Sequence, residues 1–399
     1  MNVLLCLLSD QHVPNLLSVH HFRPDRLVLI ETGDMKDKKV AEHFLGALGF
    51  GGLNYDGRYE IIPLRFEDSL KSVRGALSLA CDKYPSAHWI ANLTGGTKPM
   101  SLATYVFFKE RGALLVYTNV ARPAEILNIE VETKEVCPHR LTIKEFLAGY
   151  GFESRKSESK LADAERRAQQ WWDLSRQIAQ EASSASVLSL TDDQRKRARK
   201  KGCTLLPGQL SVSTEELSSA IAATFSLNPG DLSGRLTGYA AEFLTGGWLE
   251  VFFWGLIARH ADALDCWDVR LGLDVGRCGG PSGNDLDVAF MNAHKLTAIE
   301  CKSGSQGHDK EGDILYKVEA VTRQFRALRV QSYLATTADN IADGTGAIKP
   351  EIRNRAEIYN CRILTAATIR RLADEPDNVD LIRDTLFGQR AANASGVAP

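Results

Sequence analysis

Short apolar runs alternate with helix-period segments in the first part of the chain. The apolar runs predict strands at Val3–Leu8, Arg26–Ile30, Tyr59–Leu64, Trp89–Leu93 and Ala113–Tyr117. Between them, apolar residues recur at helical spacing in Lys38–Leu48, Asp68–Cys81 and Met100–Glu110. This alternation predicts an α/β fold, with a parallel, doubly wound, Rossmann-like sheet and helices on both faces.

The carboxyl ends of these strands carry polar and glycine residues. Ligands of doubly wound sheets bind outside such ends, which here hold Ser9, Asp10 and Gln11, then Thr32, then Asn92-Leu-Thr94-Gly95-Gly96-Thr97-Lys98. Gly95 and Gly96 let the backbone approach a ligand closely. Free N–H groups at the next helix start, with Lys98 beside them, suit an anion. The alternative is a plain glycine turn, and neither a Walker A loop nor a G-x-G-x-x-G fingerprint is present.

A charged hairpin is predicted later in the chain. Asp285-Leu-Asp287-Val-Ala-Phe and Ile299-Glu300-Cys-Lys302 both alternate as strands, and Asn292-Ala-His-Lys295 supplies the turn. A two-residue loop at Ala293 and His294 places Asp287 opposite Glu300, with Cβ atoms about 5 Å apart. The period of two puts Asp285 and Lys302 on that face too. The apolar alternates predict a covered opposite face; they are Leu286, Val288, Phe290, Ile299 and Cys301.

This charged face suggests metal chemistry. Two carboxylates at that separation can share one hard cation such as Mg²⁺ or Mn²⁺, at about 2.1 Å from each oxygen. The ammonium of Lys302 can orient a water molecule or neutralise charge that develops on a phosphate. The alternative is a solvated hairpin face without catalytic function.

Length and composition narrow the possibilities. The 399 residues are enough for two or more domains, and a net charge of −2 means that any surface for nucleic acid is local. The eight cysteines form no C-x-x-C pair, which gives no support to a zinc site or a disulfide framework and favours reduced thiols in the cytoplasm. No apolar run is long enough to predict a membrane span.

The middle of the chain is predicted to be helical. Capping patterns at 191–194 and 213–216 open two helices, and the first carries the basic run 195–201. That run either contacts phosphate backbones or forms a solvated helix face. Further elements are expected as a hairpin at 125–135, a helix at 156–180, strands at 266–275 and 330–336, and a basic helix at 315–328. The expected domains are the α/β domain at 1–150, a helical, winged-helix-like linker at 151–235, the domain of the charged hairpin at 236–390, and a disordered tail at 391–399.

Two sets of motifs resemble known families. Leu8-Ser-Asp-Gln11-x-x-Pro14-Asn15 and Asn92–Lys98 resemble the ligand-contacting motifs of CARF domains, the CRISPR-associated Rossmann fold. Asp287 with Glu300-x-Lys302 resembles the PD-(D/E)xK nuclease pattern, although no proline precedes the aspartate. In this order, over roughly residues 1–150 and 235–370, the motifs resemble the CARF-nuclease effectors of type III CRISPR systems.

The resemblance implies a homodimer that binds a cyclic oligoadenylate, often the tetra-adenylate, and then cleaves DNA and RNA with a metal. It also implies a third metal ligand, Glu250, in the Trp248-Leu-Glu-Val-Phe-Phe-Trp254 segment, which is expected to begin a helix. The alternative for Glu250 is a salt-bridged carboxylate. Implied ligand-binding residues are Ser9, Asp10, Gln11, Thr32, Asn92, Thr94, Gly95, Gly96, Thr97 and Lys98.

Two other functions are open at this point. A cyclic-nucleotide-sensing regulator would bind DNA through the basic linker without cutting it, and would have no need of Asp287, Glu300 and Lys302. A restriction- or repair-type nuclease without ligand control would have no need of the paired loops at the strand ends.

Overall fold

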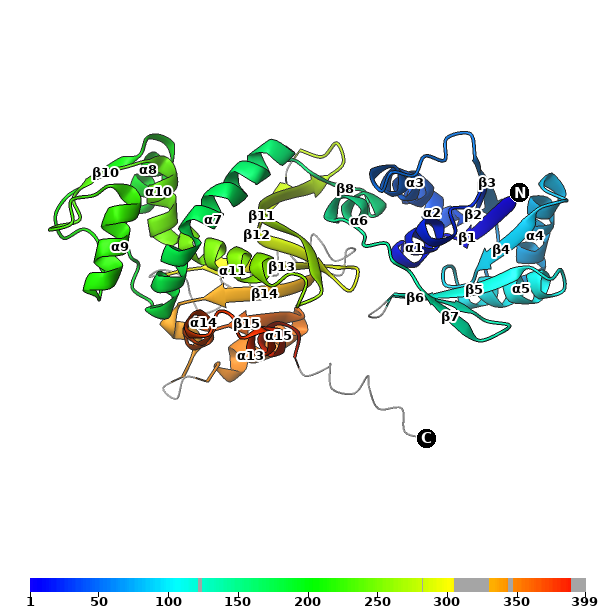
Figure 1. The fold of residues 1–399 in the computed structure, drawn as a ribbon. Coiled ribbons are helices and arrows are strands. Elements are labelled where there is room, and N and C mark those ends of the chain that lie inside the picture. Colours follow the sequence, from blue (N-terminus) through cyan, green and yellow to red (C-terminus); the bar gives the residue numbers. More distant parts are fainter. Residues whose placement is uncertain (121–123, 282, 305–329, 344–346, 389–399) are drawn as a thin grey trace. The chain divides into compact units, whose positions relative to one another are not determined.

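The structure, a computed structural model, describes residues 1–120, 124–281, 283–304, 330–343 and 347–388 (Figure 1). The chain forms two compact units. The first comprises Met1–Arg155, Val275–Gly283 and Met291–Leu296, and the second Lys156–Asp274, Asn284–Phe290 and Thr297–Pro399. The basic helix predicted at 315–328 and the tail predicted at 391–399 lie outside the described residues. The predicted domain boundaries remain predictions.

A seven-stranded sheet forms the centre of the first unit, in the order β3-β2-β1-β4-β5-β6-β7. Strands β1 to β5 pair in parallel, and β6 and β7 form an antiparallel hairpin. This confirms the predicted doubly wound sheet and the hairpin at 125–135. The strands are β1 (Asn2–Leu7), β2 (Arg26–Thr32), β3 (Tyr59–Leu64), β4 (His88–Asn92), β5 (Leu114–Asn119), β6 (Glu125–Asn128) and β7 (Thr133–Val136).

Helices cover both faces of this sheet (Figure 1). One face packs on α4 and α5 through alternating strand residues such as Val3, Leu5 and Leu7. Helix α1 contacts β1, β5 and α3, and α3 contacts α6. The helices are α1 (Val13–Phe22), α2 (Gly33–Asp37), α3 (Val40–Phe50), α4 (Leu70–Lys83), α5 (Lys98–Lys109) and α6 (Ile143–Gly149). The sequence did not predict α1, because almost its whole length is buried, polar residues included, which leaves no amphipathic period.

The second unit contains a six-stranded sheet in the order β15-β14-β13-β12-β11-β8, whose edge strand β8 and the end of β11 belong to the first unit. Its strands are β8 (Phe152–Ser154), β11 (Cys266–Arg277), β12 (Gly283–Asn292), β13 (Lys295–Lys302), β14 (Gln331–Thr336) and β15 (Cys361–Leu364). The unit also holds α7 (Glu158–Gln180), α8 (Asp192–Lys201), β9 (Cys203–Leu205), α9 (Glu215–Phe225), β10 (Gly234–Leu236), α10 (Gly238–Glu242), the π-helix η1 (Phe243–Gly247), α11 (Trp248–Arg259), the 3₁₀-helix η3 (Asp339–Ile341), α13 (Pro350–Ile358), α14 (Ala366–Asp374) and α15 (Val379–Phe387).

The hairpin between β12 and β13 has the predicted two-residue loop. Ala293 and His294 have φ values of 47° and 55°, as a type I′ turn requires. The apolar alternates Val288, Phe290, Ile299 and Cys301 lie in the main hydrophobic core of the second unit. The predicted strand pair with one covered face is therefore confirmed.

Local signals in the middle segment agree with the structure, with one correction. The Thr191–Gln194 capping box opens α8 with both reciprocal hydrogen bonds. The second pattern was placed one residue too early, because the N-cap of α9 is Thr214, whose hydroxyl accepts from the Leu217 N–H. Ser213 instead donates its hydroxyl to the Glu181 carboxylate.

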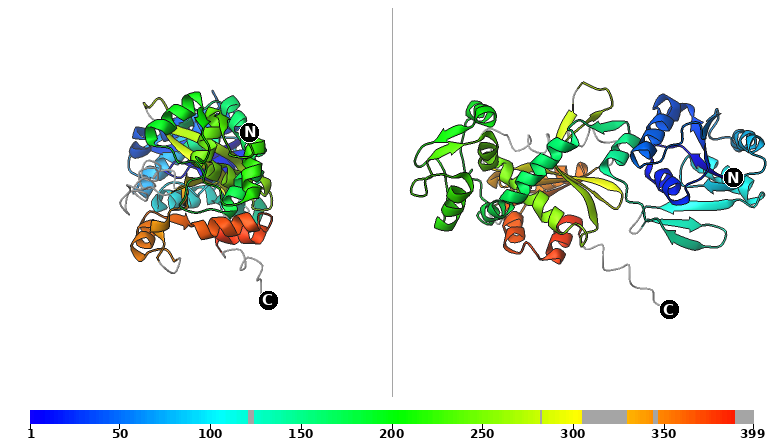
Figure 2. Two further views of the ribbon diagram at one scale, coloured as in Figure 1. Left: turned by 90° about the vertical axis from the view of Figure 1, so that its left-hand side faces the viewer. Right: turned by 45° about the horizontal axis from the view of Figure 1, so that its top comes forward.

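Helices α7 and α11 lie side by side across the second unit (Figures 1 and 2). Their contact depends on Trp172, which is buried and donates its indole N–H to the Phe252 carbonyl at 3.4 Å. Gly255 of α11 faces this ring so closely that a Cβ there would lie 1.7 Å from Cδ1 of Trp172. The close approach of the two helices thus requires glycine at this position.

We predict that Gly255→Ala destabilises the second unit by about 1–3 kcal/mol, since the added methyl must displace a buried indole. Urea unfolding followed by tryptophan fluorescence measures this. Gly46→Ala is the matched control, because it also adds a methyl to a helix but meets nothing within 4 Å. Equal stability of Gly255→Ala and the wild type would contradict the packing.

Candidate functional site

The strand order of the first sheet defines where a ligand binds. The order reverses between the neighbouring strands β1 and β4, which makes this the topological switch point of the sheet. The carboxyl end of β1 leads into Ser9–Gln11, and that of β4 leads into Leu93–Thr97. The two predicted ligand loops therefore flank one crevice.

Glycine is required where the two loops meet. A Cβ on Gly95 would lie 2.0 Å from the Leu7 carbonyl oxygen at the end of β1. Asn15 of α1 donates to that same oxygen at 2.9 Å and accepts from Asn92 at 2.8 Å. Asn92 is fully buried, and its side-chain oxygen accepts from the backbone N–H of Thr94 at 3.1 Å. Asn92 therefore holds the loop through hydrogen bonds made by its buried side chain, and this side chain does not face solvent.

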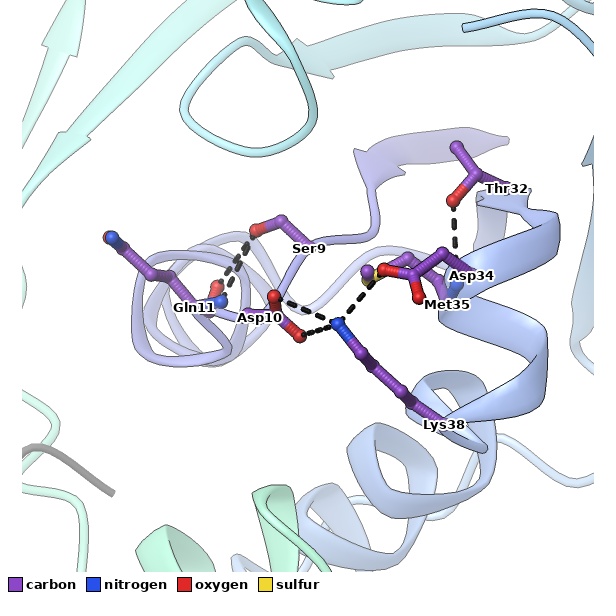
Figure 3. Close-up of polar contacts among 7 residues, drawn as sticks. All are labelled: Ser9, Asp10, Gln11, Thr32, Asp34, Met35 and Lys38. Atoms are coloured by element: carbon purple, nitrogen blue, oxygen red, sulfur yellow. Dashed lines mark hydrogen bonds and ion pairs between the residues drawn. The ribbon is translucent and has the colours of Figure 1, made fainter. Parts of the chain in front are cut away.

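The loop after β1 is held by a lysine that the sequence did not single out. Figure 3 shows the ammonium of Lys38 between the carboxylates of Asp10, at 3.0 and 3.1 Å, and Asp34, at 2.8 Å. The hydroxyl of Ser9 accepts from the backbone N–H of Gln11 at 3.3 Å. The hydrogen bonds from Lys38 to Asp34 and Asp10 raise the pKa of Lys38, so its side chain stays positively charged beside the loop.

Two of the predicted threonines cap helices. Thr32 is the N-cap of α2 and accepts from the Met35 N–H at 3.4 Å (Figure 3). Thr97 is the N-cap of α5, and Lys98 begins that helix with an exposed side chain. Lys98 makes no ion pair with another described residue. The start of α5 therefore presents both backbone N–H groups and an available ammonium.

In the second unit, the predicted charged residues of the hairpin come together. Lys302 Nζ lies 2.5 Å from Glu300 Oε1 and 3.6 Å from Asp287 Oδ2. Asp287 Oδ2 also accepts the Cys301 backbone N–H at 2.7 Å, which fixes it beside β13. Asp285 lies apart from this group, because it is exposed and pairs with Lys156 at 2.9 Å.

Burial sets the electrostatics of this group. Burial and, after it, the neighbouring charge of Glu300 raise the pKa of Asp287 to about 6. Burial alone would lower the pKa of Lys302, but Asp287 and Glu300 outweigh it and raise that pKa. The two carboxylates thus stabilise a positive charge placed between them, which in this structure is the ammonium of Lys302.

Glu250 belongs to the same electrostatic group. It lies in the first turn of α11, directly after the π-helix η1, an element that often marks functional sites. Its pKa is raised well above the usual value, first by burial and then by the charge of Asp287. A Cβ on Gly246 of η1 would lie 2.8 Å from the Ser303 hydroxyl, so η1 closely approaches the end of β13.

The donor set fits a hard divalent ion after one rearrangement. Asp287, Glu300 and Glu250 supply only carboxylate oxygens, the ligands that Mg²⁺ and Mn²⁺ prefer. In the described residues, the only three ligand atoms found within 4.8 Å of one another belong to His20, His139 and Glu145, so the three carboxylates are more widely spaced. Lys302 must withdraw from Glu300 before an ion can take its place.

The group of His20, His139 and Glu145 lies in the first unit, and its geometry does not suit a metal ion. The rings of His20 and His139 stack 3.5 Å apart with planes 7° apart, and both Nε2 atoms lie near Glu145 Oε1, at 3.2 and 2.8 Å. Two parallel rings cannot both direct in-plane lone pairs at one ion. We therefore assign the cluster a structural role, tying α1 to α6, which no sequence spacing predicted.

Comparisons with known proteins identify two domains in the chain. The sequence matches the Card1 CARF domain over residues 3–146 and the Card1-like endonuclease domain over residues 237–366. The comparison with curated proteins found no match. Within the part of the chain that the structure describes, no helix has the length and apolar character needed to cross a membrane.

Three solved structures resemble the chain. Can2 from Sulfobacillus thermosulfidooxidans in complex with cyclic tetra-adenylate has 19% identity and a TM-score of 0.66, over 97% of this chain and 99% of that one. Protein VC1899 from Vibrio cholerae has 17% identity and a TM-score of 0.75, over 94% and 96%. A type III CRISPR defence DNA nuclease activated by cyclic oligoadenylate has 17% identity and a TM-score of 0.50, over 89% and 51%. At these identities the likeness concerns the fold.

We predict that Asp287→Asn removes a pH-dependent loss of stability from the metal-free protein. The pKa of Asp287 is higher in the folded chain than its ordinary value of 3.8, so the folded wild type loses stability as pH rises from about 4 to about 6. The loss is on the order of 1–3 kcal/mol. Urea unfolding in EDTA at both ends of this window measures it. A variant that loses as much stability as the wild type would contradict the buried carboxylate.

Proposed function

Because the chain belongs to the Card1-like family of CARF-domain endonucleases, we propose that it cleaves nucleic acid in type III CRISPR defence, and only while a cyclic oligoadenylate occupies its CARF domain. The observation that carries the nuclease assignment is the Lys302 ammonium held between the half-buried carboxylates of Asp287 and Glu300. A regulator without nuclease activity would have no use for an endonuclease domain. A nuclease without ligand control would have no use for a CARF domain.

The proposed mechanism is metal-dependent hydrolysis. Asp287, Glu300 and Glu250 would hold one Mg²⁺ or Mn²⁺ ion, which supplies positive charge next to the scissile phosphate. Asp287 is kept in position for this by the Cys301 N–H. Lys302, once it has left Glu300, would orient the attacking water or neutralise charge that develops on the phosphate oxygens. The positive charges of the metal ion and of Lys302 would offset the repulsion among the three carboxylates.

The proposed activator is cyclic tetra-adenylate, bound across a homodimer. A symmetric ring offers the same phosphates to each of two subunits, so a twofold pair of CARF domains can hold it with two copies of one loop set. Lys98 and the Gly95–Gly96 backbone would take phosphate, and Ser9, Asp10 and Gln11 would lie nearer ribose or base. The ring activates only if it binds the cutting-competent arrangement more tightly than the resting one.

For the proposed cutting site, we predict that Glu300→Gln abolishes cleavage of DNA and RNA, because an amide offers no negative charge to the Mg²⁺ or Mn²⁺ ion. EDTA stops the wild type, and Mg²⁺ or Mn²⁺ restores it. Gel assays with cyclic tetra-adenylate measure both effects. Asp285→Asn is the matched control; it removes an exposed carboxylate of the same hairpin and should cut at a rate similar to wild type. Cleavage by folded Glu300→Gln, or cleavage that survives chelation, would refute the site.

For the activator, we predict that Lys98→Ala weakens the binding of cyclic tetra-adenylate by about 1–3 kcal/mol, because one charged hydrogen bond is lost. Calorimetric titration should give one ring per two chains. Lys83→Ala is the control, since this exposed lysine lies at the far end of α4 and pairs with Glu60. Saturating activator should restore much of the cleavage by Lys98→Ala. A wild type that binds no cyclic oligoadenylate would refute the proposed control.

A further inference from the structure

A cavity of about 410 Å³ opens beside the proposed metal ligand Glu250. It lies within the second unit, between α7, α10 and the junction of η1 with α11, elements that pack together in Figures 1 and 2. Its volume falls in the range of small-molecule pockets, roughly 300–1,000 Å³. The proposed hydrolysis uses Glu250 but gives no role to the rest of this cavity.

The cavity wall contains a stacking pair. Tyr239 of α10 lines the cavity and is 56% exposed, so its ring is accessible from solvent. The guanidinium carbon of Arg167, from α7, lies 3.9 Å from the centre of the tyrosine ring. Aromatic rings and guanidinium planes are the two surfaces on which proteins stack unpaired bases.

The charges on the wall favour a phosphate next to that pair. Two acids on the wall are each paired with a base, Asp163 with Arg166 at 2.9 Å and Glu242 with Arg199 at 3.4 Å. In the described residues, neither Lys160 nor Arg167 forms an ion pair with an acid. Lys160 is therefore an available cation on α7, and Arg167 adds its positive charge from its position on the Tyr239 ring.

We propose that this cavity binds the base of a substrate nucleotide close to the scissile phosphate, stacked on Tyr239 and Arg167, with Lys160 on a neighbouring phosphate. The inference rests on the proposed function, because it needs Glu250 at the cutting centre. A base inside a duplex has both faces covered by its neighbours, so the bound base must be unpaired or turned out of the stack. Tyr239 is thus a positioning residue that sets where the strand is cut.

The test uses a labelled single strand with one tetrahydrofuran abasic analogue, cut by the full-length protein with cyclic tetra-adenylate and Mn²⁺. The wild type should cut about tenfold or more slowly at one fixed distance from the analogue, where no base fills the cavity. Tyr239→Ala should cut uniformly along the strand, because it gains nothing from any base. Tyr239→Phe should restore the gap in the cutting pattern, since phenylalanine still stacks.

The control variant is Arg371→Ala, which removes an exposed cation from α14 of the same unit and should keep the wild-type pattern. Uniform cutting by the wild type, or the same gap in Tyr239→Ala, would overturn the assignment while leaving the nuclease function intact. If the wild type cuts nothing, the proposed function fails, and the cavity is then tested by fluorescence anisotropy in EDTA. In that assay, equal affinity of wild type and Tyr239→Ala for the intact strand would refute it.

Discussion

The ion pair between Lys302 and the two acids Asp287 and Glu300 is the constraint on which the second unit is built. Charges in a half-buried position are costly unless they are paired and hydrogen-bonded. The hairpin supplies the ion pairing, because the strand period of two places the side chains of Asp287, Glu300 and Lys302 on one face. The alternate residues of both strands enter the hydrophobic core. An ammonium that occupies the place between two carboxylates also defines a cation site. The same arrangement that stabilises the fold would therefore suit the metal ion of the proposed mechanism.

The hairpin that carries this group is divided between the two compact units. Asp287 and Glu300 belong to the second unit, whereas the turn residues Met291–Leu296 belong to the first. His294 of that turn is buried, and burial together with the charges of His139 and Arg140 lowers its pKa to about 4. The two strands of the hairpin thus run from the turn residues of the first unit to Asp287 and Glu300 of the second. In the proposed control by differential binding, this hairpin is a covalent connection between the CARF domain and the proposed cutting site.

Sequence reasoning succeeded where one strand, one turn or one strand end determines the geometry. The register that opposes Asp287 to Glu300 follows from a two-residue loop, and the loops at Ser9–Gln11 and Asn92–Lys98 follow from parallel strand order. It failed where residues meet only through tertiary packing. Lys38 reaches Asp10 across 28 positions, and Arg167 reaches Tyr239 from another helix. No periodicity encodes such pairs. The ion pair between Lys302 and Glu300 was likewise not predicted, since spacing identifies neighbouring residues and not their rotamers.

In the proposed site, a proton, Lys302 and a metal ion would compete for the same carboxylates, and this competition would give the site an inactive form. Raised pKa values mean that Asp287 and Glu250 tolerate neutralisation better than exposed acids do. With Lys302 paired to Glu300, one of the three acids is offset by an internal cation, and the raised pKa values of Asp287 and Glu250 favour protonation of the other two. In the proposed mechanism, an ion would bind only where its coordination outweighs the loss of that internal pair. A small change in the distance between η1 and the end of β13, which approach each other at Gly246 and Ser303, would alter this balance, because coordination by three carboxylates would depend steeply on their spacing.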